Sequence, residues 1–324
     1  MSSDEPVLPA DFQAAVDAAD KQCEAIVGNF VRRIEGRAAP DLIHHYTDAT
    51  GLFGILTDGR LRLTDIFGLN DPSELRHGIQ LAISALSEAT QRGHPAGKIF
   101  SQRFREIMTG HIEAIAHFFV GCFSQNGDEL GQWRAYGDDG RGFSICFEGK
   151  ALENQFTRLR GQLDPHNSTF PLTYDDSQLM KVQRELTDAI VANIAMPAGR
   201  GLDALVINQF MKELSRRLSL HVVRTSIFFK HEGYRSEEEF RFLHLRRFDA
   251  ELGDVKLRAR NTSLIRFTEF TWAGSTAPII RKITIGPAAN YEKAKEFVKQ
   301  CALEAKLPIE DDQILRSAIP YRGR

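Results

Sequence analysis

The chain has 324 residues, of which 42% are hydrophobic and 26% are charged, and its formal net charge is −2. These values are typical of a globular protein with a sizeable core, and they exclude a globally cationic nucleic-acid binder and a highly charged disordered chain. The chain begins with polar and acidic residues, and no apolar run approaches the roughly 20 residues that a membrane-spanning helix needs. We therefore expect a cytoplasmic protein without a membrane partner.

Two periodicities alternate along the chain. Apolar residues three or four apart predict helices, and short apolar or alternating runs predict strands. In chain order, the first predicted elements are a helix over 10–36, a strand that ends at residue 47, a helical turn over 51–56, a strand over 61–64, helices over about 72–89 and 98–117, a strand over 118–124, a helix over 128–136, a strand over 142–148 and a helix over 150–161. The later ones are mostly helical chain over 176–229 with a break at 197–201, strands over 238–245, 255–259, 264–270 and 279–285, a helix over 292–307 and a short strand near 313–315.

Strands near both ends of the chain predict a sheet assembled from distant segments, which indicates an α+β fold. We expect an N-terminal helical segment over residues 1–39 and a single α+β domain over residues 40–324, with a helical insertion at about 150–229. The first helix is expected either to pack on the core or to offer a surface to a partner. Four widely spaced cysteines, with no close pair, favour neither a zinc site nor a disulfide framework, so we expect buried reduced thiols.

Three consecutive glutamates at 237–239 precede an alternating strand. A period of two places Glu237 and Glu239 on one face of that strand and Glu238 on the other. Two carboxylates on one face repel each other, so the pKa of one is expected to rise. Such a pair can stabilise a developing cation, as in the cleavage of a glycosidic bond. The alternative is a solvated charge run that protects a sheet edge against aggregation.

Ser124 ends a predicted strand, and the short helix after it carries Trp133 and Tyr136. The two aromatic residues are three positions apart and share a helical face. We expect them to form a stacking wall for a planar ring, with Ser124 as a hydrogen-bond donor; the alternative is that Trp133 packs in the core. Candidates for bidentate contacts to a pyrophosphate, with surface ion pairs as the alternative, are Arg134, Arg141 and Arg241.

In this order, these segments resemble those of ADP-ribosyltransferases. The strand, helix and strand around His45 are similar to the opening unit of that family, whose histidine holds a ribose of NAD, and Glu237 and Glu239 are similar to its Glu-x-Glu motif. The resemblance implies an ADP-ribosyltransferase-like mixed or antiparallel sheet with helical insertions, NAD as the substrate and no metal. It implies that Glu239 is catalytic and that Glu237 orients the substrate. The NAD-binding residues that it implies are His45, Tyr46, Thr47, Ser124, Trp133, Arg134 and Tyr136.

The chain is also similar to a widespread bacterial family of uncharacterised domains. Tyr46 is a departure from the pattern, because many NAD-binding relatives have glycine at this position, and glycine lets a ligand approach closely. The side chain of Tyr46 is therefore expected either to point to the opposite face or to reshape the pocket. The similarity spans about residues 40–318 and rests on His45-Tyr46-Thr47, residues 69–74, Phe123-Ser124, Trp133, Tyr136, Lys230, Tyr234, Glu237, Glu239, Arg241 and residues 283–287.

We expect NAD to bind between the His45 strand and the Glu239 strand, and ADP-ribose to pass to a macromolecular acceptor, which is left open among protein, DNA and RNA. The resemblance implies a bacterial toxin or phage-defence effector with an antitoxin or immunity partner, and a water acceptor would make it a NAD glycohydrolase. One alternative is a metal-dependent nuclease or phosphodiesterase in which Asp71, Glu74 and the two glutamates gather an ion. Another is a non-catalytic sensor or binding module. Basic residues between 241 and 266 indicate either a nucleic-acid target or a solvated sheet face.

Overall fold

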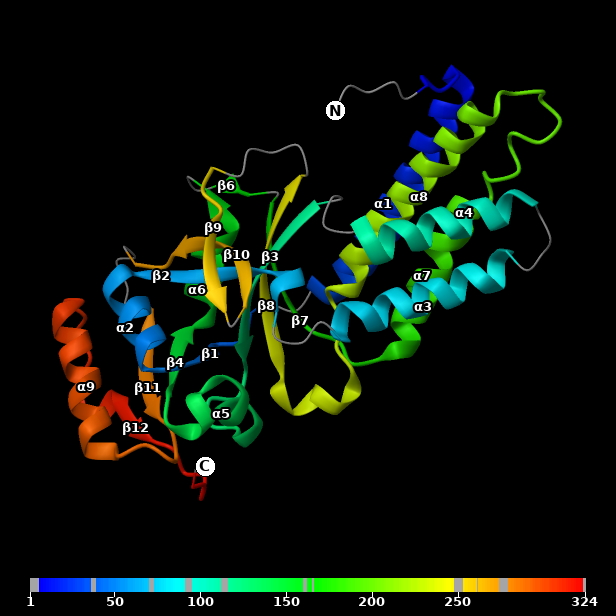
Figure 1. Cartoon of the computed structure of the whole chain (residues 1–324). Helices are drawn as coiled ribbons and strands as arrows, with labels where there is room; N and C mark the ends of the chain where they lie inside the picture. The colour runs from blue at the N-terminus through cyan, green and yellow to red at the C-terminus, as the bar shows by residue number, and fades with distance from the viewer. Residues whose placement is uncertain are drawn as a thin grey trace.

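The structure is a computed structural model, and it describes residues 6–35, 39–69, 73–90, 95–111, 116–159, 162–164, 166–247, 253–260, 262–273 and 279–322. A mixed sheet of ten strands and a bundle of long helices lie side by side (Figure 1). The predicted α+β class is confirmed at this level. Residues 70–72, which belong to the motif at residues 69–74 and to the start of the helix predicted over 72–89, lie outside the described residues.

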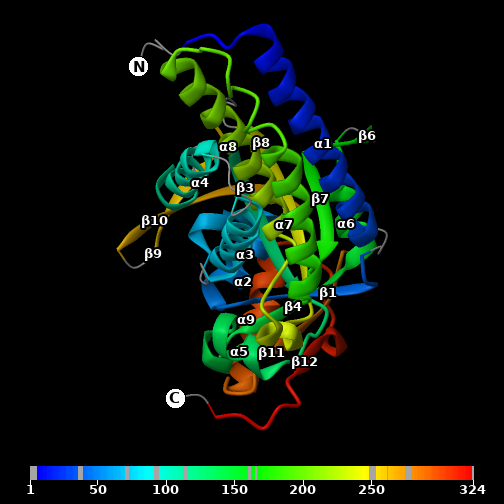
Figure 2. The same cartoon turned by 90° about the vertical axis from the view of Figure 1, so that its right-hand side faces the viewer.

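The helical bundle brings together helices from the N-terminal part of the chain and from its middle (Figure 2). The apolar stripe that predicted the first helix is buried against the later helices, since Phe12, Val16 and Cys23 are each at most 1% exposed. The first helix is therefore part of the core of the bundle. Among the described helices, none is long and apolar enough to cross a bilayer. The bundle contains α1 (Ala10–Glu35), α3 (Ser73–Thr90), α4 (Pro95–Glu106), α7 (Asp176–Val191) and α8 (Ala204–Ser226).

The sheet has the order β12-β11-β4-β1-β3-β2-β10-β9, and β8 adds to it by pairing with both β3 and β7. The pair β11–β12 is parallel, and the other pairs described here are antiparallel. Its strands are β1 (Leu42–Thr47), β2 (Arg60–Asp65), β3 (Ala116–Ser124), β4 (Phe143–Glu148), β7 (Asn167–Pro171), β8 (Glu239–Arg247), β9 (Lys256–Arg260), β10 (Ser263–Thr271), β11 (Ile280–Ile285) and β12 (Ile314–Arg316). The short strands β5 (Arg158–Leu159) and β6 (Gln162–Leu163) pair separately.

The two faces of the sheet belong to two hydrophobic cores, because side chains alternate along each strand. Phe118 and Val120 of β3 and Leu243 of β8 pack against the helical bundle. Phe119 of β3 and Phe242 of β8 face the other core. That second core is closed by α2 (Ala49–Asp58), α6 (Gly149–Thr157) and α9 (Tyr291–Glu304).

The sheet divides at β3. One edge of β3 pairs with β8 along the whole strand. The other edge pairs with β2 at Phe119 and Val120 and with β1 at Ser124. Between these points, no strand of the described chain is paired with residues 121–123 on that edge. The strands β1 and β2 thus diverge from β3, and the candidate site lies at this divergence.

Several elements differ from the prediction. The helix expected over 150–161 ends at Thr157, and the short strands β5 and β6 follow it. The helix expected over 98–117 ends earlier, since α4 stops at Glu106, a π-helical turn covers Ile107–His111 and β3 already begins at Ala116. Strand β7 was not predicted, and it lies inside the segment that was expected to be a helical insertion. Its segment is short and partly polar and ends in Pro171, so it carries only a weak strand pattern. Strand β7 pairs with β8 alone, and proline is tolerated in such an edge strand.

Candidate functional site

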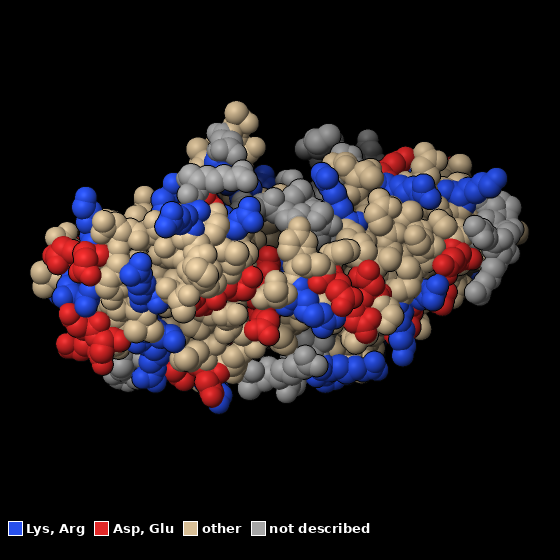
Figure 3. Space-filling model, turned by 90° about the horizontal axis from the view of Figure 1, so that it is seen from below, with Lys and Arg blue, Asp and Glu red and all other residues tan. Residues whose placement is uncertain are grey.

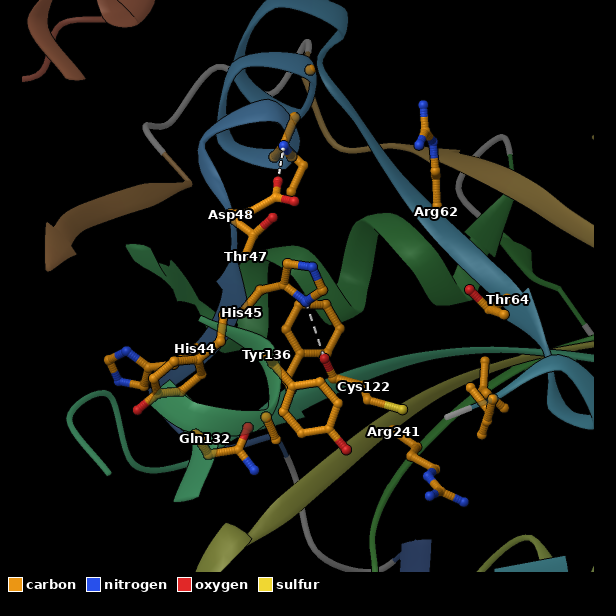
Figure 4. Close-up of a pocket in the computed structure, with 18 of the residues that line it drawn as sticks. His44, His45, Thr47, Asp48, Arg62, Thr64, Cys122, Gln132, Tyr136 and Arg241 are labelled. Carbon is orange, nitrogen blue, oxygen red and sulfur yellow. Dashed lines mark hydrogen bonds between the residues drawn. The ribbon is translucent and has the colours of Figure 1, made fainter. Parts of the chain in front are cut away.

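A cavity of about 520 Å³ opens where β1 and β2 diverge from β3 (Figure 4). Its walls come from these three strands, from β8 and β9, and from α2 and the short helix α5 (Leu130–Tyr136). Its volume falls in the range of small-molecule binding sites, which is roughly 300–1,000 Å³. Glu237 and Glu239 line the cavity at the start of β8, and arginines of β2 and β9 line it at its far end.

The start of α2 forms the wall beside β1. Asp48 caps the helix by accepting a hydrogen bond from the backbone amide of Gly51 at 2.6 Å, and Gly59 ends it with a left-handed φ of 63°. Gly51 lies so close to β1 that an added Cβ would be 1.9 Å from Oγ1 of Thr47. Glycine at this position therefore lets the helix begin directly against the strand, with Thr47 in the cavity wall.

His45 reaches across the divergence to β3. Its Nδ1 lies 3.1 Å from the carbonyl oxygen of Cys122, and Figure 4 shows this contact. Because a carbonyl only accepts, Nδ1 carries the proton and Nε2 is left as an acceptor. Burial lowers the pKa of His45 and outweighs the opposing effect of the Cys122 carbonyl, so the ring is neutral near pH 7. A neutral imidazole with an acceptor nitrogen suits the hydroxyl group of a sugar.

Tyr46 and His44 point to the opposite face of β1. The hydroxyl of Tyr46 donates to the carbonyl of Asn126 at 2.8 Å and accepts from the amide of Glu129 at 3.0 Å. The hydroxyl of Tyr46 therefore holds the loop between β3 and α5 on the opposite face of β1, although Tyr46 is also among the residues that line the cavity. His44 is buried and points away from His45 in Figure 4.

The two aromatic residues of α5 have different environments. Trp133 is fully buried, packs on Tyr46 and donates from Nε1 to Asp128 at 2.7 Å, so it is a packing residue and does not line the cavity. Tyr136 is 37% exposed and lines the cavity. A step of three residues turns a helix by about 300°, which leaves the two side chains about 60° apart, enough to separate core from rim. The stacking wall is thus reduced to Tyr136.

Other side chains of this segment also hold the local structure. Glu129 caps α5, while Asp128 accepts hydrogen bonds from Trp133 and Ser317. Ser124 is 2% exposed, and its hydroxyl donates to the carbonyl of Glu237 at 2.7 Å. Ser124 therefore positions Glu237 and does not itself face the cavity.

The carboxylate end of the cavity is a buried charge cluster. Nζ of Lys230 lies 2.6 Å from Oε2 of Glu237 and 2.9 Å from Oε2 of Glu239. Nε of Arg241 contacts the other oxygen of Glu239 at 2.5 Å. Lys230, Glu239 and Arg241 are each at most 5% exposed, so these pairs are shielded from water. The cluster has as many positive as negative charges.

The prediction that repulsion between the two glutamates raises the pKa of one of them is wrong for Glu239. Burial alone would raise the pKa of Glu239, but the charges of Arg241 and Lys230 overcome it and lower that pKa to about 2. The expected alternation of Glu237, Glu238 and Glu239 along one strand is also wrong. Glu237 ends a 3-10 helix, η5 (Glu232–Glu237), and Glu238 has a left-handed φ of 43°, so the strand starts only at Glu239.

The arginines proposed for a pyrophosphate are placed elsewhere or are occupied. Arg134 is exposed and does not line the cavity. Arg141 pairs with Asp138 at 3.1 Å on the surface. Arg241 reaches the cavity, but its guanidinium contacts Glu239 and donates to the carbonyl of Ile227 at 3.1 Å.

Sequence reasoning missed the arginines of β2, which line the far end of the cavity. Arg60 and Arg62 alternate with buried Leu61 and Leu63, so a period of two carries the signal for an exposed cationic face. Arg258 and Arg260 of β9 join them there. These two were noted only as part of a basic run. The cavity thus has a cationic wall that depends on the pairing of strands distant in sequence.

Within the described part of the chain, no group of three or more His, Cys, Asp or Glu side chains is placed to hold a metal ion. Asp71 lies outside the described residues, and the side chain of Glu74 is likewise not described. The cysteines Cys23, Cys146 and Cys301 are buried as expected, while Cys122 is partly exposed and lines the cavity.

Comparison with known families adds one finding. A family described as "Protein of unknown function (DUF2971)" matches residues 132–242. The matched segment runs from α5 to β8 and includes Tyr136, Lys230, Glu237 and Glu239. No curated protein and no solved structure matches the chain. The predicted similarity to an uncharacterised family is supported over this segment, and the match itself carries no activity.

Proposed function

We propose that the protein is an NAD-dependent ADP-ribosyltransferase whose fold is the ADP-ribosyltransferase-like one. One observation carries the proposal: His45 and Glu239, far apart in sequence, line one cavity. Their strands flank β3, which pairs with β1 at Ser124 on one edge and with β8 on the other. This arrangement supports the proposal, because the resemblance implies a cleft between a histidine strand and a glutamate strand.

The charge state of Glu239 suits cleavage of the nicotinamide–ribose bond. As the bond between ribose C1′ and the nicotinamide nitrogen breaks, its electron pair leaves with nicotinamide, and the ribose becomes an oxocarbenium-like cation. An ionised carboxylate that accepts a hydrogen bond from the 2′-hydroxyl strengthens that bond as the charge develops. A carboxylate has about four lone-pair positions, so contacts with Lys230 and Arg241 leave room for such a hydroxyl.

The surrounding residues take complementary roles in the proposal. Arg241 and Lys230 keep Glu239 ionised, and Lys230 fixes Glu237 beside it. The acceptor nitrogen of His45 binds a ribose hydroxyl, and the ring of Tyr136 stacks on nicotinamide at the rim. The nucleophile of the acceptor then bonds to C1′ as the bond to nicotinamide breaks, and the proton of the nucleophile is lost to water.

The test is nicotinamide release and NAD binding by the purified protein. We expect Glu239→Gln to lower the rate of release by about 100-fold while NAD still binds, because the lost interaction is made mainly in the transition state. Glu304→Gln, an exposed site on α9, is the matched control and should not change either quantity. Activity that survives a chelator, with ADP-ribose transferred from labelled NAD to a macromolecule, is the expected pattern.

Other outcomes separate the alternatives. Failure of the wild type to bind NAD would overturn the proposal. Nicotinamide release without transfer to any macromolecule would make the protein a NAD glycohydrolase. Absence of nicotinamide release, together with cleavage of a nucleic acid or another phosphodiester that a chelator abolishes, would favour the metal-dependent nuclease or phosphodiesterase instead.

A further inference from the structure

The cationic end of the cavity continues onto one face of three paired strands. In β10, Glu269 lies opposite Arg62 of β2, and Ile265 lies opposite Arg258 of β9. Directly opposed residues project to the same face, and so do residues two apart along a strand. We call the basic part of this face the arginine face; it consists of Arg60, Arg62, Lys256, Arg258 and Arg260.

The arginine face has more positive charge than its own carboxylate balances. On the described parts of β2, β9 and β10, the carboxylate of this face is Glu269, and both Arg60 and Lys256 lie 2.8 Å from it. Arg62 instead lies over the ring of Phe267, with 5.1 Å from its Cζ to the ring centroid.

Arg258 is the more unusual member of the face. It is partly buried, its Nε is buried without a hydrogen-bond partner in the described chain, and its contact with the hydroxyl of Thr64 is long at 3.4 Å. Burial and the nearby charges of Arg62 and Arg260 lower its pKa. A buried donor without a partner is costly, and an anion bound here would supply both the missing acceptor and the missing charge.

We propose that the arginine face binds the phosphate backbone of a single-stranded nucleic acid and that a base of this strand is the ADP-ribose acceptor. The second half of the inference rests on the proposed function. In that step, a nitrogen of the base bonds to C1′ of the ribose, nicotinamide leaves with the electron pair of the broken bond, and the base nitrogen loses its proton to water.

A polymer fits this face better than a single pyrophosphate does. The face has five cations and one carboxylate, which leaves more positive charge than the two phosphates of a dinucleotide neutralise. Arg60 is half-exposed and Arg62 and Lys256 are exposed, so the charge extends from the cavity into solvent. Alternate residues of a strand repeat about every 6.7 Å, which presents cations in a row to a repeating anion.

The strand is single because a reacting base must leave the stack. Enzymes that modify a base inside a pocket act on single strands or extrude the base from a duplex. The cavity adjoins the arginine face and is lined by the ring of Tyr136 at the glutamate end. Positive and negative side chains are interspersed on the surface shown in Figure 3, so attraction of a polyanion must come from a local cluster and not from a global field.

Fluorescence anisotropy with a labelled 12-nucleotide single strand of DNA or RNA tests the proposal without NAD. We expect the wild type to bind and Arg62→Gln/Arg258→Gln to bind at least about 10-fold more weakly. The slope of log K against log salt concentration should fall by about 1.4 in magnitude, because each lost phosphate contact contributes about 0.7 for a single strand. The matched control, Arg32→Gln/Arg216→Gln on the helical bundle, should bind like the wild type. So should Glu239→Gln.

Calorimetric NAD binding by the same variants separates this inference from the proposed function. Equal binding of the oligonucleotide by the wild type and the Arg62→Gln/Arg258→Gln variant, or no binding by either, would overturn the inference. If this variant instead loses NAD binding, the face holds the pyrophosphate of NAD, and the inference fails while the proposed function stands. If the wild type binds the oligonucleotide but not NAD, the proposed function fails while the nucleic-acid site stands.

Discussion

The Nδ1 atom of His45 lies 3.1 Å from the carbonyl oxygen of Cys122, across the part of β3 that neither β1 nor β2 covers. This contact satisfies a backbone acceptor that strand pairing leaves open, and it also sets the tautomer of the ring. The same divergence of strands that opens the cavity thus prepares the side chain that lines it.

The first prediction concerns this histidine. We expect His45→Ala to weaken NAD binding by about 10-fold, or about 1.4 kcal/mol, because one hydrogen bond to the ligand is lost. A small loss of thermal stability should accompany it, since the Cys122 carbonyl loses its partner. Calorimetry and thermal unfolding measure the two effects. The exposed His166→Ala serves as the control, and unchanged NAD affinity in His45→Ala would argue against ribose binding at this position.

The second prediction concerns the buried cluster. Lys230→Met leaves Glu237 and Glu239 facing each other with one cation fewer, so we expect the free energy of unfolding to fall by about 3 kcal/mol. Lys150→Met removes an exposed pair with Asp41 and should have little effect. Urea denaturation of both variants checks the difference. Equal stability of the two variants would mean that Lys230 does not hold the carboxylates together.

The third prediction follows from the low pKa of Glu239. Its folded-state pKa of about 2 lies below the ordinary value of 4.5, so its ionisation stabilises the folded state. This contribution is complete above about pH 5 and is lost as the pH falls toward 2. The stability of Glu239→Gln should therefore fall less steeply over that range than that of the wild type. Chemical denaturation at several pH values measures both slopes, and parallel slopes would contradict the assignment.

The fourth prediction separates the two aromatic residues of α5. Trp133→Phe loses a buried hydrogen bond to Asp128 and some buried volume, so we expect the protein to lose about 2 kcal/mol of stability. Its kcat for nicotinamide release should stay near that of the wild type. Tyr136→Ala should instead keep its stability and raise KM for NAD. A raised KM for NAD in Trp133→Phe, with an unchanged KM in Tyr136→Ala, would identify Trp133 as the stacking residue instead.

Local periodicity was sufficient for most elements of this chain. The first helix, the strand that carries His45 and the helix that carries Tyr136 were all predicted close to their observed bounds. Each depends on residues within one or two turns of one another. Strand β7 was not predicted because its short segment owes its conformation to pairing with β8, which is distant in sequence.

The residues of the site divide in the same way. Glu239, His45 and Tyr136, which the sequence and its resemblance to ADP-ribosyltransferases proposed for the site, line one cavity, whereas Trp133 and Ser124 hold the surrounding structure. Residue type alone does not distinguish a cavity side chain from a buried one, because a small rotation on a helix decides between core and rim.

By itself, the sequence determined the class of fold, the positions of most helices and strands, and the pair of segments that carry His45 and Glu239. Tertiary structure alone decided that Lys230 lies between two glutamates, that the sheet divides at β3, and that β2 and β9 share one cationic face. The physical reason is range. Periodicity is set by neighbours along the chain, whereas the pKa of a carboxylate and the charge of a surface depend on side chains brought together by strand pairing and burial.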